Sequence, residues 1–323
     1  MKEDKPIDLS AIIVNWNTKE LLRNCLRSIY RETKNVILEV ILIDNASVDG
    51  SPNMVEREFP EVILIKNKQN FGFARANNQG FARAQGRYIL IVNPDTEIVD
   101  NAFFKMVQYL DSNKDVGATG AKFLYPDGSF QRYYNRFPTF SSIIGRWFLP
   151  ARLACRLKLV RSYLMLDDNF DRILEVPQPA GACIMVRKDL FVRKNFMDEQ
   201  FPIFFGDVDL CRRIYKKGLK IVVLPDARII HYRGKGGLEQ GKMPLSLSAE
   251  YFISMVDYFA KHEGVIEATV LRLFFSLGFL LRTWLLLMGV ILGTKSQEEF
   301  KHEVHRVAAF LKKKSSFDSM VAG

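Results

Sequence analysis

Apolar runs and amphipathic stretches alternate along the first third of the chain. The runs occupy residues 10–14, 38–43, 62–65 and 88–92. Between the first two runs, Leu22, Leu26 and Ile29 recur at the spacing of one helix face, and helical patterns also follow the second and third runs. Strands that alternate with helices predict βαβ units and a mainly parallel sheet. The run 88–92 has no charged residue, so we expect a fully buried strand of a parallel sheet.

The alternation stops at the segment 128–166 and returns after it. From there the pattern predicts a strand, a helix, two short strands and a helix, over 182–186, 208–217, 220–224, 228–231 and 248–263. The polar tail from Lys295 onward predicts a last helix. We therefore expect a doubly wound α/β domain over 1–240, with an insertion at about 128–178, and a helical extension over 241–323.

The positive charge of the chain is concentrated in one segment. The net charge is +10 at pH 7, and no acidic residue lies between Asp127 and Asp167, where Trp147 and Phe148 are also found. The basic residues of this segment are Arg132, Arg136, Arg146, Arg152, Arg156, Lys158 and Arg161. Basic, aromatic and aliphatic side chains together suit an anionic membrane surface. Nucleic acid would also use aromatic stacking, but no nucleic-acid-binding motif is present, so we expect no such partner.

The stretch 269–293 is apolar and long enough to span a bilayer with some tilt. Arg272 and Arg282 interrupt it, and a central arginine costs a spanning helix roughly 3 kcal/mol. We therefore favour a helix at the membrane interface over a span or a core helix, and all three stay open. Four cysteines without paired spacing and an N-terminus without an apolar leader predict a cytoplasmic protein, bound peripherally to the inner face of the plasma membrane.

Polar residues end three of the predicted strands, at Asn15, Asp44 and Asn93. Ligands of open α/β sheets bind beyond the carboxyl ends of the strands. Asp95 follows closely and could provide a carboxylate oxygen to a cation that holds a diphosphate, or it could simply cap a turn. Asp44 could accept a hydrogen bond from a uracil or thymine ring or from a ribose hydroxyl. A turn closed by its side chain is locally as good an interpretation.

The loop before the helix that we expect over 74–84 contains Asn70 and Gly72. A glycine allows close approach to a backbone, and the N-terminus of a helix favours an anion. A diphosphate or a nucleoside could therefore pack here, near Asn77 of the same helix. Loops rich in asparagine and glycine are common, so this motif is weak when taken alone.

A second acidic site lies further along the chain, at Asp207 and Asp209. Asp207 fits the role of a general base for a sugar hydroxyl, although the pair could also serve as a helix cap and a dipole partner. His231 ends a short apolar run and could bind a metal or a phosphate, while an isolated histidine is more often structural. Arg233 lies in a glycine-rich loop that could fold over a diphosphate or remain solvated.

Taken together, these motifs resemble an inverting family 2 glycosyltransferase of the Rossmann-like GT-A fold, with the bacterial rhamnosyltransferase-like group the most similar branch. They cover most of residues 10–232 in the order of that family. The matching segments are VNWN (14–17), DNASVDGS (44–51), NFGFARANNQG (70–80), NPDT (93–96), GACIMVRKDLF (181–191), DVDLCRR (207–213) and PDARIIH (225–231). Jointly they are specific, although each is weak alone.

The resemblance implies a role for each matching residue. Asp44 would contact the nucleotide base, Asp95 would bind Mg²⁺ or Mn²⁺ with His231 close to the metal and the diphosphate, and Asp207 would deprotonate the acceptor. The nucleotide sugar would be bound by Asn17, Asp44, Asn70, Gly72, Asn77, Asn93, Asp95 and Arg233. The donor would be a dTDP- or UDP-linked sugar, such as rhamnose, and the acceptor a lipid-linked saccharide or another glycan of the cell envelope. The family usually has Glu directly before the base, where this chain has Gly206.

Two other classes of protein stay open. A sugar-1-phosphate nucleotidyltransferase would carry a glycine-rich basic loop near its N-terminus, and residues 12–25 contain none. A non-catalytic, membrane-associated homologue that only binds nucleotide sugars is the other alternative, and Gly206 is the residue that favours it.

Overall fold

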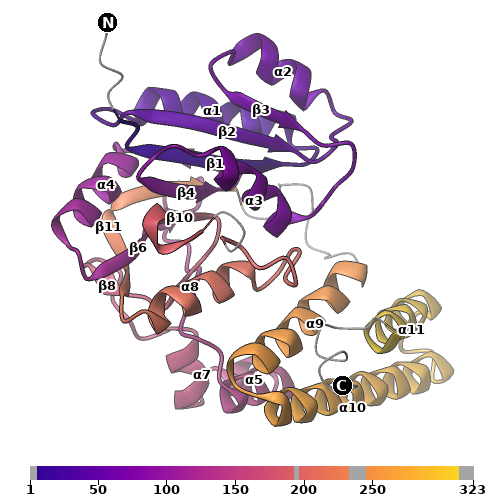
Figure 1. Ribbon diagram of the computed structural model, residues 1–323. Helices are drawn as coiled ribbons and strands as arrows, with labels where there is room; N and C mark the ends of the chain where they lie inside the picture. The colour runs from indigo at the N-terminus through magenta and orange to yellow at the C-terminus, as the bar shows by residue number, and fades with distance from the viewer. Residues whose placement is uncertain (1–5, 193–195, 233–244, 313–323) are drawn as a thin grey trace, which may run out of the picture. The chain divides into compact units, whose positions relative to one another are not determined.

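The computed structural model describes residues 6–192, 196–232 and 245–312 (Figure 1). The chain divides into two compact units. The first consists of the described residues of Met1–Pro138, Arg161–Pro202 and Gly206–Gln240, and the second of those of Thr139–Val160, Ile203–Phe205 and Gly241–Gly323. Each unit is described by itself below.

A nine-stranded sheet forms the centre of the first unit. Its strands are β1 (Leu9–Asn15), β2 (Leu38–Asp44), β3 (Ile63–Lys66), β4 (Tyr88–Val92), β5 (Thr96–Ile98), β6 (Val116–Leu124), β8 (Leu174–Glu175), β10 (Cys183–Arg187) and β11 (Lys220–His231). The order is β3-β2-β1-β4-β10-β6-β11-β5, and β8 pairs with β11. The first four strands of this order are parallel to one another, so the predicted βαβ units are confirmed. A separate two-stranded sheet joins β7 (Tyr134–Asn135) to β9 (Gln178–Pro179).

Two predictions about the strands need correction. Strand β4 is buried along its whole length, but only β1 runs parallel to it, and β10 runs antiparallel on its other side. The two short strands predicted at 220–224 and 228–231 form one strand, β11, with a register shift between Leu224 and Arg228. Pro225 lies at the shift, and because proline has no backbone N–H it cannot donate to a sheet ladder. The irregular residues therefore bend the strand without ending it.

Helices cover both faces of the sheet (Figure 1). One face carries α1 (Lys19–Glu32), α2 (Ser51–Glu58) and α4 (Ala102–Ser112), and the other carries α3 (Phe73–Arg83) and α8 (Gly206–Lys216). Successive residues of a strand point to opposite faces, so Ile13 packs under α1 while Ile12 packs under α3. Gly80 lets α3 approach closely, because a Cβ there would lie 2.6 Å from Cγ2 of Ile12. These contacts hold the loops at the strand ends in fixed positions.

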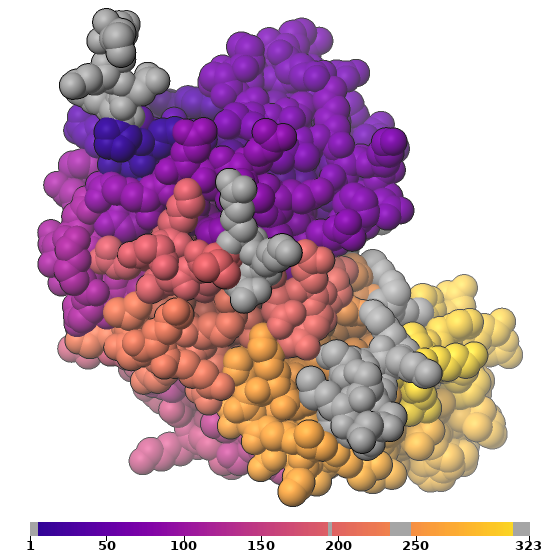
Figure 2. All heavy atoms as spheres, in the orientation of Figure 1, coloured from indigo at the N-terminus to yellow at the C-terminus, as the bar shows by residue number. Residues whose placement is uncertain are grey.

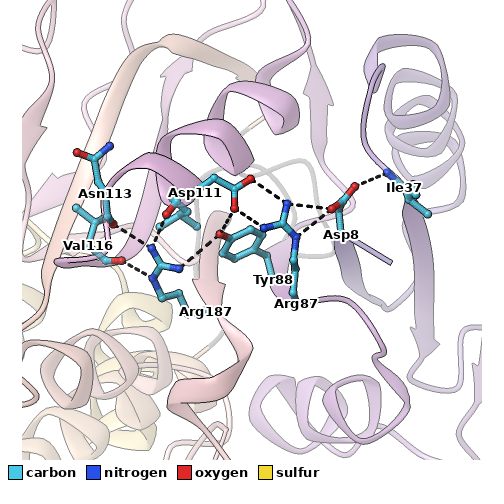
Figure 3. Close-up of polar contacts among 9 residues, drawn as sticks. Asp8, Ile37, Arg87, Tyr88, Asp111, Asn113, Val116 and Arg187 are labelled. Carbon is cyan, nitrogen blue, oxygen red and sulfur yellow. Dashed lines mark hydrogen bonds and ion pairs between the residues drawn. The ribbon is translucent and has the colours of Figure 1, made fainter. Parts of the chain in front are cut away.

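A polar network closes the amino-terminal end of β4 (Figure 3). Arg87 donates to Asp8 (Nε–Oδ1 3.0 Å) and to Asp111 (NH2–Oδ2 2.9 Å), and the Tyr88 hydroxyl donates to Asp111 Oδ1 at 2.8 Å. The Arg87 guanidinium lowers the pKa of the Asp111 carboxyl. Arg187, at the end of β10, donates to backbone carbonyls at the end of α4 and the start of β6. The strands are thereby tied together at the end opposite the predicted site.

Arginines of the basic segment are used in different ways. In the first unit, Arg136 pairs with Asp168 (3.1 Å), Arg161 pairs with Asp167, and Arg132 donates to a backbone carbonyl. The other three arginines of the segment and its lysine belong to the second unit: Arg146, Arg152, Arg156 and Lys158. The charge excess of the segment is therefore greater in the second unit than in the first.

The second unit is helical. Its helices are α5 (Phe140–Phe148), α6 (Ala151–Ala154), α9 (Leu245–His262), α10 (Val265–Ile291) and α11 (Gln297–Lys312), and α7 (Lys158–Tyr163) begins in it. Aromatic rings join α9, α10 and α11: the Phe279 ring lies 5.0 Å from that of Phe252 and 5.1 Å from that of Phe310. Within the described residues, α10 is the one helix long and apolar enough to cross a membrane. The helices predicted near the C-terminus are confirmed.

Candidate active site

The loops after β1 and β2 are joined by side-chain hydrogen bonds. Asn15 and Asp44 are register partners at the ends of the two strands. Asn15 Nδ2 donates to Asp44 Oδ1 at 2.8 Å, and the backbone N–H of Ser47 donates to Asp44 Oδ2 at 2.9 Å. Asp44 is only 2% exposed. Its carboxylate therefore closes the turn, as the local alternative predicted, although each oxygen retains a lone pair that can accept a second hydrogen bond.

Asn17 connects the same two loops. It has a positive φ of 54°, a conformation that asparagine tolerates better than most residues. Its backbone N–H donates to Ser47 Oγ at 2.9 Å, and its Oδ1 accepts from the N–H of Val48 at 2.8 Å. The half-buried Asn17 side chain thus holds the loop that follows Asp44 against the loop that follows β1.

The N-terminus of α3 is occupied by a protein carbonyl. The N–H groups of Phe73 and Ala74 both donate to the Pro202 carbonyl, at 2.6 and 3.2 Å. Gly72 has a φ of 81°, and a Cβ there would lie 2.8 Å from the same oxygen. Asn70 Oδ1 accepts from the Gly72 N–H at 2.9 Å. The expectation that a diphosphate binds at these first N–H groups is therefore wrong for this structure, because the segment ending at Pro202 already takes them.

Asn77 lies inside the protein, with 0% of its surface exposed. Its Nδ2 donates to the Phe73 carbonyl at 2.9 Å, one helical turn earlier. The neighbouring Asn78 instead holds the 197–199 segment, through the backbone of Met197 and the side chain of Glu199. The structure thus gives Asn77 a hydrogen bond within α3, and its role in donor binding stays a prediction. Arg233, by contrast, lies outside the described residues.

Asp95 and His231, which lie far apart in the sequence of the first unit, are brought together by the sheet. Asp95 follows β4, and His231 is the last residue of β11, paired with Thr96 of β5. The Tyr232 N–H donates to the Asp95 carbonyl at 2.9 Å. His231 Nε2 then lies 3.6 Å from Asp95 Oδ1, and the two residues are 4% and 7% exposed. The pair thus forms a nearly buried acid–imidazole contact at the carboxyl end of β4.

The other ring nitrogen of His231 contacts a residue that the sequence did not point to. His231 Nδ1 lies 2.6 Å from Oε1 of Gln131, and Gln131 Nε2 donates to the His231 carbonyl at 3.2 Å. The rings of Phe123 and Tyr133 each lie 5.6 Å from the imidazole. Nothing in the sequence could have singled out Gln131, because the contact joins residues 100 positions apart.

The chemistry of this donor set fits a divalent cation shared with a ligand. Asp95 offers a hard oxygen and His231 an imidazole nitrogen. In the part of the chain that the structure describes, no cluster of three or more His, Cys, Asp or Glu residues could hold a metal by itself. Mg²⁺ commonly takes only one or two protein carboxylates and completes its shell with phosphate and water. Two protein donors therefore suit Mg²⁺ or Mn²⁺ bound together with a diphosphate.

Asp207 lies in the first turn of α8 and is half-buried. Its Oδ2 accepts from the Gly181 N–H and its Oδ1 from the Val208 N–H, both at 2.9 Å. Burial raises the pKa of Asp207, and the two N–H groups oppose this rise. Asp209 points elsewhere, as residues two apart on a helix must: it is fully buried and accepts from Arg213 Nε at 2.8 Å. A raised pKa and a fixed orientation suit a general base.

Consecutive residues before β10 link the two acidic sites. The Gly181 N–H donates to Asp207, and the Ala182 carbonyl accepts from the Asn93 N–H at 2.9 Å. Asp95 lies two residues beyond Asn93, so both acids lie at the same edge of the sheet. A Cβ at Gly181 would lie 2.8 Å from the Asp207 Cβ, so this approach requires glycine. Gly181 and Ala182 thus connect the two acids within the first unit, and their convergence on one ligand stays a prediction.

Gly206, where the family usually has Glu, is the buried first residue of α8. A Cβ there would meet Cε of Met197 at 3.2 Å and the Phe201 carbonyl at 3.4 Å. A larger side chain would have to displace the flexible end of Met197. The local packing is therefore built around glycine at this position.

Comparison with known families supplies the identification. Residues 10–191, more than half of the 323-residue chain, match the model for Glycosyl transferase family 2. The chain belongs to this family. The resemblance drawn from the motifs is confirmed, and the matched residues include Asp44, Asp95 and Gly181.

Relatives of this family 2 chain differ widely in length. It is 24% identical over 277 residues to the N-acetylglucosaminyl-diphospho-decaprenol L-rhamnosyltransferase of Mycobacterium tuberculosis, covering 79% of this chain and 85% of the relative. It is 26% identical over 234 residues to the uncharacterized protein y4gI of Sinorhizobium fredii, covering 69% of this chain but only 24% of that protein. Among solved structures, GalNAc-T7 with UDP, GalNAc and Mn²⁺ has a TM-score of 0.56 at 18% identity, covering 75% of this chain and 46% of that one. This likeness confirms the GT-A fold.

Proposed function

We propose that the protein is a metal-dependent inverting glycosyltransferase. It would move rhamnose or a similar sugar from a dTDP- or UDP-sugar to a lipid-linked or polysaccharide acceptor of the cell envelope. The observation that carries the proposal is the half-buried carboxylate of Asp207, held at the same sheet edge as the Asp95–His231 pair. Family membership and the similarity to a decaprenol-linked rhamnosyltransferase support the substrate class.

Asp207 would act as the general base of a single displacement. Each of its oxygens accepts one backbone N–H and keeps a further lone pair for the acceptor hydroxyl. As the hydroxyl oxygen bonds to the sugar C1, its proton passes to Asp207, and the bond from C1 to the diphosphate oxygen breaks on the opposite face. The configuration at C1 inverts, and the nucleoside diphosphate departs.

The donor would be held by the edge formed by β1, β2 and β4. Asp95 and His231 are the residues that would bind Mg²⁺ or Mn²⁺, which when bound supplies positive charge to the leaving diphosphate. The joined loops at Asn17 and Asp44 would support the nucleoside, with Asp44 using its remaining lone pairs. Asn93 would contact the donor between the Asp95–His231 pair and the loops at Asn17 and Asp44.

The transferase would work at a membrane surface, a proposal that rests on α10. One face of this helix, with Leu271, Phe275 and Phe279, is buried in the helical unit. The opposite face exposes a row of apolar side chains. Figure 2 draws the atoms of this helix in orange. The row consists of Ile266, Val270, Leu273, Leu277, Leu280, Leu281, Trp284, Leu285 and Ile291. A helix with one face packed on protein and one apolar face exposed suits a position in the plane of the interface.

The charges of this unit agree with that position. Arg282 extends to the nearly buried Glu303 of α11 (3.3 Å), away from the apolar row. The guanidinium of Arg282, one of the two charges that disfavour a membrane span, is thereby paired with an acid of the same unit. The basic residues of 139–160 belong to the same unit, and Phe148 packs on Phe274 of α10. Basic residues next to an apolar row favour an anionic leaflet.

Vesicle flotation tests the membrane proposal. We expect the protein to float with vesicles that contain anionic lipid and to be released by alkaline carbonate, which leaves a spanning protein in the membrane. Replacing both Leu277 and Leu281 by Glu should reduce the bound fraction at least tenfold, whereas Ile173→Glu, a single change from apolar to acidic at an exposed residue of the first unit, should not. Equal flotation of both variants would exclude α10 as the contact.

A donor screen tests the transferase proposal. Nucleotide sugars are added one at a time, with and without Mn²⁺, and the melting temperature is recorded, since a ligand of the folded state raises it. The donor that shifts it only with Mn²⁺ is then incubated with a lipid-linked acceptor. Transfer with inverted configuration supports the proposal. Binding without transfer to any acceptor would favour the non-catalytic alternative.

A further inference from the structure

The amide of Gln131 contacts His231 at two points, and this double contact fixes the direction of both hydrogen bonds. The backbone carbonyl of His231 can only accept, so the NH₂ group of Gln131 must face it, at 3.2 Å. The amide oxygen Oε1 must then face Nδ1 of the imidazole, at 2.6 Å. An amide oxygen only accepts, so Nδ1 must carry the hydrogen.

The consequence falls on the other ring nitrogen. A neutral imidazole carries one hydrogen, so when Nδ1 holds it, Nε2 presents a lone pair. Nε2 faces Asp95 Oδ1 at 3.6 Å, too far for a hydrogen bond. Two acceptors thus face each other at a nearly buried position. A cation between them would satisfy both.

Gln131 is itself held in place by the fold. It is 0% exposed, and its backbone N–H donates to the Phe123 carbonyl of β6 at 2.9 Å. A short turn leads to it from β6, closed by the Tyr125 N–H donating to the Ser129 carbonyl at 2.8 Å. The amide therefore has a fixed position from which to orient the imidazole.

We propose that Gln131 is a positioning residue for the divalent cation site: it fixes the hydrogen on Nδ1 and the ring orientation of His231, so that Nε2 is aimed as a ligand. Partners that hold the second nitrogen of a ligating histidine typically contribute 10–100-fold to metal affinity. This inference rests on the proposed metal site of the transferase. It adds a residue, remote in sequence, on which the affinity of that site depends.

The first test needs neither metal nor activity. The protein labelled with ¹⁵N in histidine is studied by long-range ¹H–¹⁵N NMR at a pH well above the ordinary histidine pKa of about 6.5. The chain has four histidines, and the His231→Gln variant assigns the signal of interest. We expect His231 to carry its hydrogen on Nδ1. A hydrogen on Nε2 would overturn the proposal, and the tautomer itself is read from the unaltered protein.

The second test measures Mn²⁺ affinity by electron paramagnetic resonance in the presence of UDP. Gln131→Met keeps the length of the side chain and removes both hydrogen bonds, so it should weaken Mn²⁺ binding about 10–100-fold. Tyr134→Phe is the matched control: the buried hydroxyl of Tyr134 bonds Ala121 and Phe123 of the same strand, and its loss leaves His231 untouched. It should change the affinity less than twofold.

The outcomes separate the two proposals. If the unaltered protein binds Mn²⁺ and Gln131→Met binds it equally well, Gln131 has no positioning role. If Gln131→Met and Tyr134→Phe weaken binding equally, the effect is general destabilisation, and the inference is also wrong. If the unaltered protein does not bind Mn²⁺ but Asp207→Asn abolishes transfer, the metal part of the proposed function fails while its base remains.

Discussion

The two ends of the central sheet both carry acidic residues, but those residues have different partners. At the amino-terminal end, Asp8 and Asp111 face the guanidinium of Arg87, and Tyr88 also donates to Asp111 (Figure 3). At the carboxyl end, Asp207 accepts only backbone N–H groups, and within the described residues it forms no ion pair with a basic side chain.

This difference separates a structural cluster from a chemical one. A carboxylate paired with arginine has its charge already neutralised and its pKa lowered, as for Asp111. A half-buried carboxylate without a cation beside it has a pKa raised by desolvation and remains able to take a proton, as for Asp207. Proximity of acids to a sheet edge is therefore not enough to define a site; the partners of each acid decide.

The largest expected effect comes from Asp207→Asn. The amide keeps the shape of the side chain and loses the base, so transfer should fall by about 10²–10⁴-fold. The variant should still fold and bind nucleotide sugar, with a loss of about 1 kcal/mol in stability, because the amide NH₂ cannot accept the second of the two backbone N–H groups. Steady-state rates with saturating donor, together with a thermal-shift titration, measure both. Turnover within threefold of the unaltered enzyme would remove Asp207 from the reaction.

A smaller loss is expected for Gly181→Ala. The new methyl group would lie 2.8 Å from the Asp207 Cβ and push the carboxylate away, and a displacement of about 1 Å can cost about 10²-fold in rate. Gly206→Ala is the matched control, because the tightest contact of its methyl group would be with the flexible end of Met197 at 3.2 Å, and the Phe201 carbonyl would lie at 3.4 Å. It should cost less than fivefold. A reversed order of the two would contradict the geometry at Asp207.

The pH dependence of transfer reports on the same carboxylate. Burial raises the pKa of Asp207, and the base acts only when deprotonated, so activity should be lost as the pH falls through this raised value. The acid limb of kcat/KM should therefore lie above the ordinary aspartate value of about 3.9. A limb at or below that value, measured where the protein stays folded, would show that Asp207 is not perturbed as proposed.

At the opposite end of the sheet the expected effect is on stability. Arg187→Met removes the donor that serves carbonyls near the end of α4 and the start of β6, and should lower the free energy of unfolding by about 2–4 kcal/mol. Turnover per folded enzyme should change less than twofold. Arg172→Met, at an exposed arginine, is the control for loss of charge. Urea unfolding measures the change in the free energy of unfolding. If Arg187→Met lost turnover without losing stability, the amino-terminal end of the sheet would not have the purely structural role described here.

The local pattern of the sequence predicted much of the first unit because its strands are buried on one or both faces. The apolar run 88–92 and the helical spacing after Asn15 are local signals, and both elements form where predicted. The antiparallel pairing of β10 with β4 could not be predicted, because strand direction is decided by distant partners.

The candidate site was predictable where a motif carries its own geometry. Asp95 comes shortly after β4, and Asp207 lies at the start of α8. The sequence pattern of these two elements therefore predicted at which edge of the sheet the acids lie. The contact of Pro202 with the start of α3 and that of Gln131 with His231 depend on segments more than 90 residues away. Such contacts leave no trace in local spacing, which is why the sequence could not show that Pro202 takes the first N–H groups of α3.

The most direct test compares one acid from each end of the sheet in a single experiment. Asp207→Asn and Asp111→Asn are purified in parallel, and transfer rate and unfolding free energy are measured for both. We predict that Asp207→Asn folds, loses transfer and loses only about 1 kcal/mol of stability, whereas Asp111→Asn keeps transfer per folded enzyme and loses about 1–2 kcal/mol of stability. If Asp111→Asn lost transfer while Asp207→Asn retained it, the carboxyl edge would not be the catalytic one.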